Sequence, residues 1–195
     1  MVLLGPDDPL PRLPRRIAVA GVSGAGKTTL AGRIGAALGI EHVEIDALFH
    51  GPGWTPRPEF RTDVEAFVAH HTWVTEWQYR SARPLLTARI DLLVWLDLPT
   101  AVVLRQVVAR TVTRRLRREE LWNGNVEGPL TDVFRDSEHI LRWAWRTRHK
   151  YRGLGDRMSS ERPALALVRL RSHAEADRWL GTLAAAATAD DGAAD

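Results

Sequence analysis

Short apolar runs alternate along the chain with longer segments in which apolar residues recur every three or four positions. The short runs are typical of strands buried on both faces, and the longer spacing is typical of helices. The predicted strands are 17–20, 42–45, 73–77, 92–96 and 165–170. The predicted helices are 28–38, 59–71, 99–118 and 132–151, with a last helix beginning at the capping pattern Ser172-His-Ala-Glu175. This alternation predicts an α/β fold with a parallel sheet.

The two ends of the chain lack this pattern. Residues 1–14 are rich in proline and aspartate, and residues 184–195 consist largely of alanine, threonine and aspartate. We therefore expect a flexible leader over 1–14, one domain over 15–183 and a flexible tail over 184–195. A chain of 195 residues is long enough for one domain with its own core.

The composition excludes several kinds of site. Cysteine is absent, so the chain forms no disulfide, no thiolate metal site and no cysteine nucleophile. No apolar run approaches the roughly 18 residues that span a bilayer, and the first residues do not fit a secretory signal. We therefore expect a cytoplasmic protein without a membrane partner. The net charge of +3 does not by itself imply nucleic-acid binding.

The segment Gly21-Val-Ser-Gly-Ala-Gly-Lys27-Thr28 fits the pattern G-x-x-x-x-G-K-[ST] of a phosphate-binding loop. Its glycines let successive backbone N–H groups turn toward one anion, and the following helix directs its free N–H groups to the same place. In such loops the lysine reaches the β and γ phosphates, and the hydroxyl binds Mg²⁺. The preceding apolar strand and the following helical pattern are the context that this motif requires.

Further segments carry a resemblance to a known family. They are Gly21–Thr29, Ile45–Trp54, Trp73–Tyr79, Val94–Pro99 and Leu121–Asn125. With them the chain resembles the adenylate-kinase-like P-loop kinases, and within that group the small bacterial ATP-binding proteins labelled adenylate kinase or DNA topology modulation (FlaR-like) protein. The resemblance implies a three-layer fold with a parallel five-stranded sheet in the order 2-3-1-4-5. It also implies a helical, arginine-rich lid at about 110–131, with ATP and Mg²⁺ as cofactors.

This resemblance assigns the nucleotide-binding residues. The phosphate loop would contribute Gly21, Val22, Ser23, Gly24, Ala25, Gly26, Lys27, Thr28 and Thr29. Thr28 would bind the metal, and Lys27 would act in catalysis.

Three carboxylates lie at the ends of predicted strands, where ligands of an open parallel sheet collect. Asp46 is expected to orient or activate the acceptor, beside a pocket formed by the stretch from Phe49 to Trp54. Glu76 is the expected Walker B carboxylate that positions Mg²⁺, although related proteins often have Asp-Gly where this chain has Glu76-Trp77. Asp97 is an alternative for that role. The structural alternatives are a strand-end aspartate that caps a turn for Asp46 and a helix-start aspartate for Asp97.

Residues 105–118 contain six arginines and no acidic residue. The resemblance implies that arginines of this helix contact adenine and phosphates. Arg105 and Arg110 match the nucleotide-binding positions best, and Arg110 and Arg114 are the expected catalytic cations. Planar guanidinium groups suit the charge that spreads over phosphoryl oxygens. A solvated basic face and contact with a nucleic-acid backbone are the alternatives.

Together these features predict a kinase that transfers a phosphoryl group from MgATP to a small molecule or nucleotide. The alternative is a regulatory or nucleic-acid-associated ATPase that uses the same loop, and we do not favour it because no DNA-reading module is present. A switch GTPase ranks lower because the guanine-selecting Asn-Lys-x-Asp motif is absent. The acceptor and the oligomeric state stay open.

Overall fold

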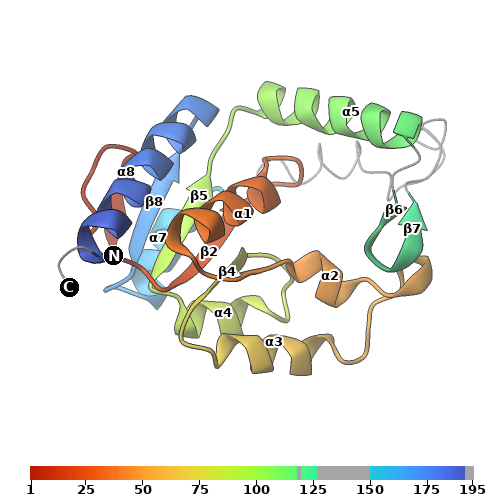
Figure 1. The fold of residues 1–195 in the computed structure, drawn as a ribbon, viewed down its shortest axis with the longest axis horizontal. Helices are drawn as coiled ribbons and strands as arrows, with labels where there is room; N and C mark the ends of the chain where they lie inside the picture. Colours follow the sequence, from red (N-terminus) through yellow and green to blue (C-terminus); the bar gives the residue numbers. More distant parts are fainter. Residues whose placement is uncertain (118–119, 127–149, 192–195) are drawn as a thin grey trace.

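The computed structural model describes residues 1–117, 120–126 and 150–191. Within these residues six strands form one sheet in the order β1-β8-β5-β2-β4-β3, and all neighbouring strands are parallel (Figure 1). The strands are β1 (Val2–Leu4), β2 (Arg16–Gly21), β3 (His42–Val43), β4 (Trp73–Glu76), β5 (Leu92–Leu96) and β8 (Ala166–Leu170). The helices are α1 (Lys27–Leu38), α2 (Ile45–Phe49), α3 (Phe60–Val68), α4 (Arg83–Arg89), α5 (Thr100–Arg117), α7 (Leu154–Glu161) and α8 (His173–Asp191).

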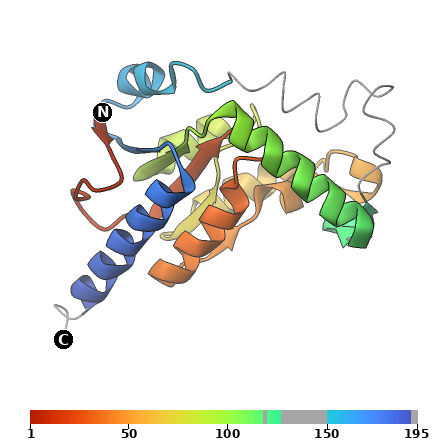
Figure 2. The same cartoon turned by 90° about the horizontal axis from the view of Figure 1, so that it is seen from above.

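The core lies on both faces of the sheet. In β2 the alternation of side chains sends Ile17 and Val19 to one face and Ala18 and Ala20 to the other, and all four are fully buried. Helices α1 and α8 cover the first face and lie side by side, joined by an ion pair between Arg33 and Asp177 (Figures 1 and 2). Side chains of α3, α4 and α7 cover the second face. A parallel sheet covered on both faces explains why its strands have continuous apolar sequences.

The sheet differs from the predicted one by a sixth strand. The five expected strands lie next to one another as β3-β4-β2-β5-β8, and β1 pairs with β8 beyond them. The prediction of five strands was therefore wrong, because the first residues of the segment expected as a leader join the sheet. Leu4 is buried in the core, and Leu10 and Leu13 pack against the same cluster, so this segment has apolar side chains that gain from burial.

The second predicted strand is shorter than expected. It ends at Val43, and Asp46 lies in the first turn of α2 rather than at the end of a strand. The Ile45 N–H instead makes a long-range hydrogen bond to the carboxylate of Glu76 at 3.1 Å, which helps to fix the start of α2.

Other differences concern helices. The sequence pattern did not predict α4 or α7, and α8 continues to Asp191 through most of the segment expected as a tail. The helix predicted over 132–151 lies outside the described residues except for its last two positions. No helix in the described parts of the chain is long and apolar enough to cross a membrane.

The expected lid, 110–131, begins within α5, a helix that extends past the sheet in Figure 2. A small antiparallel hairpin follows it, formed by β6 (Glu120–Leu121) and β7 (Asn125–Val126) around the 3-10 turn η2 (Trp122–Gly124). This hairpin reaches the segment after α2, which contains the 3-10 turn η1 (Pro52–Trp54), as Figure 1 shows. The remainder of the expected lid, residues 118–119 and 127–131, lies outside the described residues.

Candidate phosphate-binding and catalytic site

The phosphate-loop segment connects the buried strand β2 to the start of α1. Gly24 and Gly26 have φ angles of 83° and 90°, in the left-handed region that side chains disfavour. The Ala25 N–H donates to the Val22 carbonyl at 3.1 Å and closes the turn. Helix α1 then begins at Lys27 with no side-chain cap and no acidic residue in its first turn. This arrangement leaves the positive end of the helix suited to an anion.

Gly24 also brings the loop close to the first half of α5. A Cβ atom at this position would lie 2.1 Å from Cγ2 of Val107 in α5. The absence of a side chain at Gly24 is therefore what lets α5 pack on the loop.

Lys27 contacts the loop and lies within electrostatic range of two carboxylates. Its Nζ donates to the Val22 carbonyl at 3.3 Å. Loss of solvent lowers the pKa of the Lys27 ammonium, and the nearby Asp46 and Glu76 carboxylates oppose that effect. The charge of Arg110 acts in the same direction as burial, so Arg110 lies within electrostatic range of Lys27. Two acids and two further cations, Arg110 and Arg83, thus lie within electrostatic range of Lys27.

Glu76 is the last residue of β4 and is fully buried. Its Oε1 lies 3.1 Å from Nε2 of His42, and its Oε2 accepts the Ile45 N–H. Burial alone would raise the pKa of Glu76, but these hydrogen bonds, with a smaller contribution from Thr28, hold the pKa below its usual value. A carboxylate with this environment stays ionised beside the phosphate loop.

The oxygen groups of Thr28 and Glu76 suit a hard cation such as Mg²⁺. Thr28 lies close enough to Glu76 to lower its pKa, so a hydroxyl and an ionised carboxylate are brought together. In the described part of the chain no group of three or more His, Cys, Asp or Glu side chains could hold a metal alone. A hydroxyl and a carboxylate suit Mg²⁺, which in proteins usually keeps water and phosphate ligands as well. Asp97, the alternative carboxylate, instead forms an ion pair with Arg169.

Asp46 is held by side chains from the segment after β4. Its Oδ1 accepts hydrogen bonds from the Gln78 amide and from the Tyr79 hydroxyl, the latter at 2.6 Å. The Tyr79 hydroxyl also lies 3.1 Å from Nε2 of His50, and its ring stacks on Phe49 at 3.9 Å between centroids. Burial, and then the charge of Asp46, raise the pKa of Tyr79. The hydroxyl therefore stays protonated and acts as the hydrogen-bond donor to Asp46. Tyr79 has a φ of 56°, a strained backbone for a bulky side chain that marks functional sites.

The hairpin tip contacts the loop after α2 through Asn125, which is buried. The Oδ1 of Asn125 accepts the Trp54 N–H at 3.0 Å, and its Nδ2 donates to the Gly51 and Trp122 carbonyls at 2.9 and 2.7 Å. The rings of His50 and Trp122 stack at 5.9 Å, and Trp54 meets His50 edge to face. The expected lid therefore reaches the aromatic stretch that follows Asp46.

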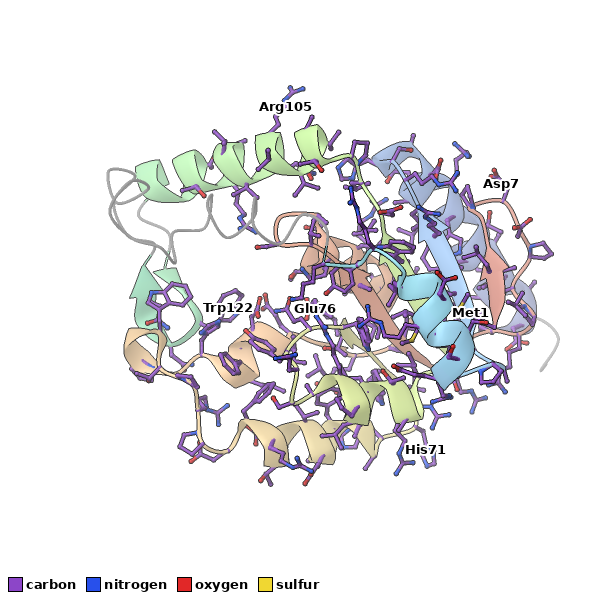
Figure 3. The ribbon with its side chains drawn as sticks, turned by 180° about the vertical axis from the view of Figure 1, so that it is seen from behind. Met1, Asp7, His71, Glu76, Arg105 and Trp122 are labelled. Atoms are coloured by element: carbon purple, nitrogen blue, oxygen red, sulfur yellow. The ribbon has the colours of Figure 1, made fainter. Side chains whose placement is uncertain are left out.

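Some of the predicted site residues lie near Lys27, and others are exposed or point away from it. Lys27 of the loop lies within electrostatic range of Asp46, Glu76 and Arg110, whereas Thr29 is exposed. Figure 3 shows Arg105 pointing outward from α5, away from Glu76 and Trp122. The backbone of Arg114 belongs to α5, but its side chain lies outside the described part of the structure.

The sequence pattern did not single out Gln78 and Tyr79 as Asp46 partners, or His42 as the partner of Glu76. The segment Trp73–Tyr79 was part of the family resemblance, and this was the available signal for the first two. Arg83 was also missed, because it belongs to the unpredicted helix α4. Its guanidinium lies 4.6 Å above the ring of Trp77, directly after Glu76.

Two solved structures with a similar fold are described as kinases. The chain is 22% identical to a gluconokinase from Sinorhizobium meliloti 1021, with a TM-score of 0.50, over 94% of this chain and 99% of that one. It is 21% identical to shikimate kinase from Acinetobacter baumannii in complex with shikimate, with a TM-score of 0.50, over 87% of this chain and 90% of that one. No family model and no curated protein matches the sequence. The chain thus shares the α/β fold of these two structures, and its resemblance to the FlaR-like group stays a prediction.

Proposed function

We propose that this protein is a kinase that transfers the γ-phosphoryl group of ATP to a hydroxyl of a small molecule or nucleotide. The observation that carries the proposal is the placement of Lys27, at the end of the phosphate loop, within electrostatic range of both Asp46 and Glu76. One carboxylate suits a metal beside the loop, and the other suits an acceptor. The kinase folds of the two similar structures support this assignment.

In this mechanism the triphosphate binds to the N–H groups of the loop and the start of α1, and Lys27 contacts its β and γ phosphates. Thr28 and Glu76 would hold Mg²⁺, which when bound neutralises charge on the triphosphate. Arg110, and by its sequence position Arg114, would stabilise the charge on the migrating phosphoryl oxygens.

Asp46 receives the acceptor. Both of its hydrogen bonds from described residues fall on Oδ1. We therefore assign Oδ2 to the acceptor hydroxyl, whose oxygen attacks the γ-phosphorus while the bond to the β-phosphate oxygen breaks. The hydroxyl proton passes to Asp46, and ADP leaves. Tyr79 and Gln78 fix the carboxylate in one orientation during this step.

The test uses Lys27→Ala, with Arg33→Ala on the exposed side of α1 as the matched control. Binding of the ATP analogue AMPPNP with magnesium is measured by calorimetry, and ATP turnover is measured by ADP release. Lys27→Ala should weaken nucleotide binding and abolish turnover while its circular dichroism spectrum is unchanged, and the control should behave as wild type. Unchanged turnover in Lys27→Ala would refute the proposed site.

A further inference from the structure

A group of cations lies around the aromatic pair Trp77 and Tyr151, beside the proposed site. Nη2 of Arg83 donates to the Tyr151 hydroxyl at 3.1 Å, and the guanidinium lies 4.6 Å from the Trp77 ring centroid and 5.4 Å from that of Tyr151. The ammonium of Lys150 lies 5.7 Å from the Tyr151 ring. Arg157 lies 6.0 Å from the Trp77 ring. These contacts hold the guanidinium of Arg83 in a fixed orientation.

The cations have no acidic partner among the described residues. The ion pairs of the described structure do not include Arg83, Lys150 or Arg157, and the buried Nε of Arg83 has no hydrogen-bond partner there. Burial, and then the charges of Arg83 and Lys27, lower the pKa of Lys150 to about 8. Like charges held together without a counterion favour an anionic ligand.

The position of this group places it on the acceptor side of the phosphate loop. Arg83 begins α4, and α4 packs on the same face of the sheet as α2 and α3, opposite to α1 and α8. The Tyr151 hydroxyl donates to the Trp77 carbonyl at 3.3 Å, and the Trp77 N–H donates to the Val19 carbonyl at 2.8 Å in β2. The cations are thereby attached to the strand that leads into the loop. Arg83 and Lys27 lie within electrostatic range of each other.

We propose that Arg83 and Lys150 form an anion subsite for the acceptor, so that the acceptor is an acidic small molecule that bears a carboxylate or a phosphate. This assignment rests on the proposed kinase function. In it, Asp46 receives the reacting hydroxyl while the subsite binds the acid group at another position of the same molecule. The planar guanidinium suits either oxyanion, since both present two oxygens at a similar spacing.

The subsite can be tested with inorganic phosphate as the probe. Protein saturated with AMPPNP and magnesium is titrated with phosphate in a calorimeter. Arg83→Gln and Lys150→Gln should each weaken phosphate binding about tenfold or more, because each removes a charge-assisted contact. Arg89→Gln, at the exposed end of the same helix α4, is the matched control and should leave the affinity unchanged.

The outcomes separate this assignment from the proposed function. Equal phosphate affinity in Arg83→Gln and wild type would overturn the subsite, as would the absence of phosphate binding to protein that binds AMPPNP. Loss of AMPPNP affinity in Arg83→Gln, in proportion to the loss of phosphate affinity, would assign these cations to the triphosphate instead. Failure of wild type to bind AMPPNP would refute the kinase function and the subsite with it.

A turnover assay tests whether the subsite binds the acid group of an acceptor, and not only free phosphate. ADP release is compared for D-gluconate against the neutral D-glucitol, and for AMP against adenosine. We expect turnover with an acidic member of a pair, and a KM for that acid that rises about tenfold in Arg83→Gln with little change in the KM for ATP. Equal turnover of an acid and its neutral counterpart would overturn the assignment.

Discussion

Replacing Gly24 by alanine tests whether the phosphate loop depends on its close contact with α5. The new Cβ would lie 2.1 Å from Cγ2 of Val107, well inside van der Waals contact, and the backbone there has a φ of 83°. The left-handed backbone costs about 1–2 kcal/mol for a residue with a Cβ. Relief of the overlap costs about 1–3 kcal/mol more, so the free energy of unfolding should fall by about 2–5 kcal/mol.

Two further variants serve as controls, one for the backbone cost and one for the cost of the overlap. Gly39 has a φ of 63°, and a Cβ added there would meet no other atom within 4 Å, so Gly39→Ala should show the backbone cost alone. Val107→Ala removes the clashing methyl group; because Val107 is fully buried, that change alone costs about 2 kcal/mol. In the double variant the two effects should not add, and the coupling should recover about 1–3 kcal/mol.

The assay is urea denaturation of wild type, the three single variants and the double variant, with AMPPNP affinity measured on each. We expect Gly24→Ala to be less stable than Gly39→Ala and to bind the nucleotide more weakly, since the loop must shift away from α5. Equal destabilisation of the two glycine variants, or strict additivity in the double variant, would refute the packing argument.

Three further predictions concern the carboxylates and the hairpin. Because the folded-state pKa of Glu76 is lowered, its stabilising effect is complete above the unfolded value of about 4.3 and is lost as the pH falls through the folded value. Urea denaturation between about pH 3 and 6 should therefore show a smaller acid-induced loss of stability in Glu76→Gln than in wild type. An identical change of the free energy of unfolding with pH in both proteins would contradict this. Tyr79→Phe removes the 2.6 Å hydrogen bond to Asp46 and should lower kcat about 10- to 100-fold with the fold intact, as judged by ADP release and circular dichroism; an unchanged kcat would exclude a positioning role. Asn125→Ala removes the two hydrogen bonds that Asn125 makes to Trp54 and Gly51, and should speed hydrogen exchange at the Trp54 amide. Unchanged protection would show that the aromatic contacts and the hydrogen bond from Asn123 to the His50 carbonyl suffice.

The parts of the site that the sequence predicts are those with local determinants. The glycines of the phosphate loop, its lysine and the flanking strand and helix lie in one short segment, so the spacing alone indicates their arrangement. Glu76 could be placed because it lies at the end of the third predicted strand, and the ends of parallel strands meet at one edge of a sheet.

The rest of the site depends on contacts between distant segments. The start of α2, and with it the position of Asp46, is fixed in part by a hydrogen bond to Glu76 that periodicity does not reveal. The contact of Asn125 with Gly51 and Trp54 joins two loops in the same way. Arg83 escaped prediction because α4 is only seven residues long, too short for a helical repeat to stand out.

The pairing of β1 with β8 has a consequence for folding during synthesis. β1 leaves the ribosome before the other strands of the sheet, and its partner β8 leaves after them, with the register Leu3 to Leu167. The sheet edge therefore stays incomplete until β8 has emerged, and Leu4, which is buried in the finished fold, is exposed to solvent meanwhile. Closure of this edge joins two segments from opposite ends of the sequence and should be among the last events of cotranslational folding.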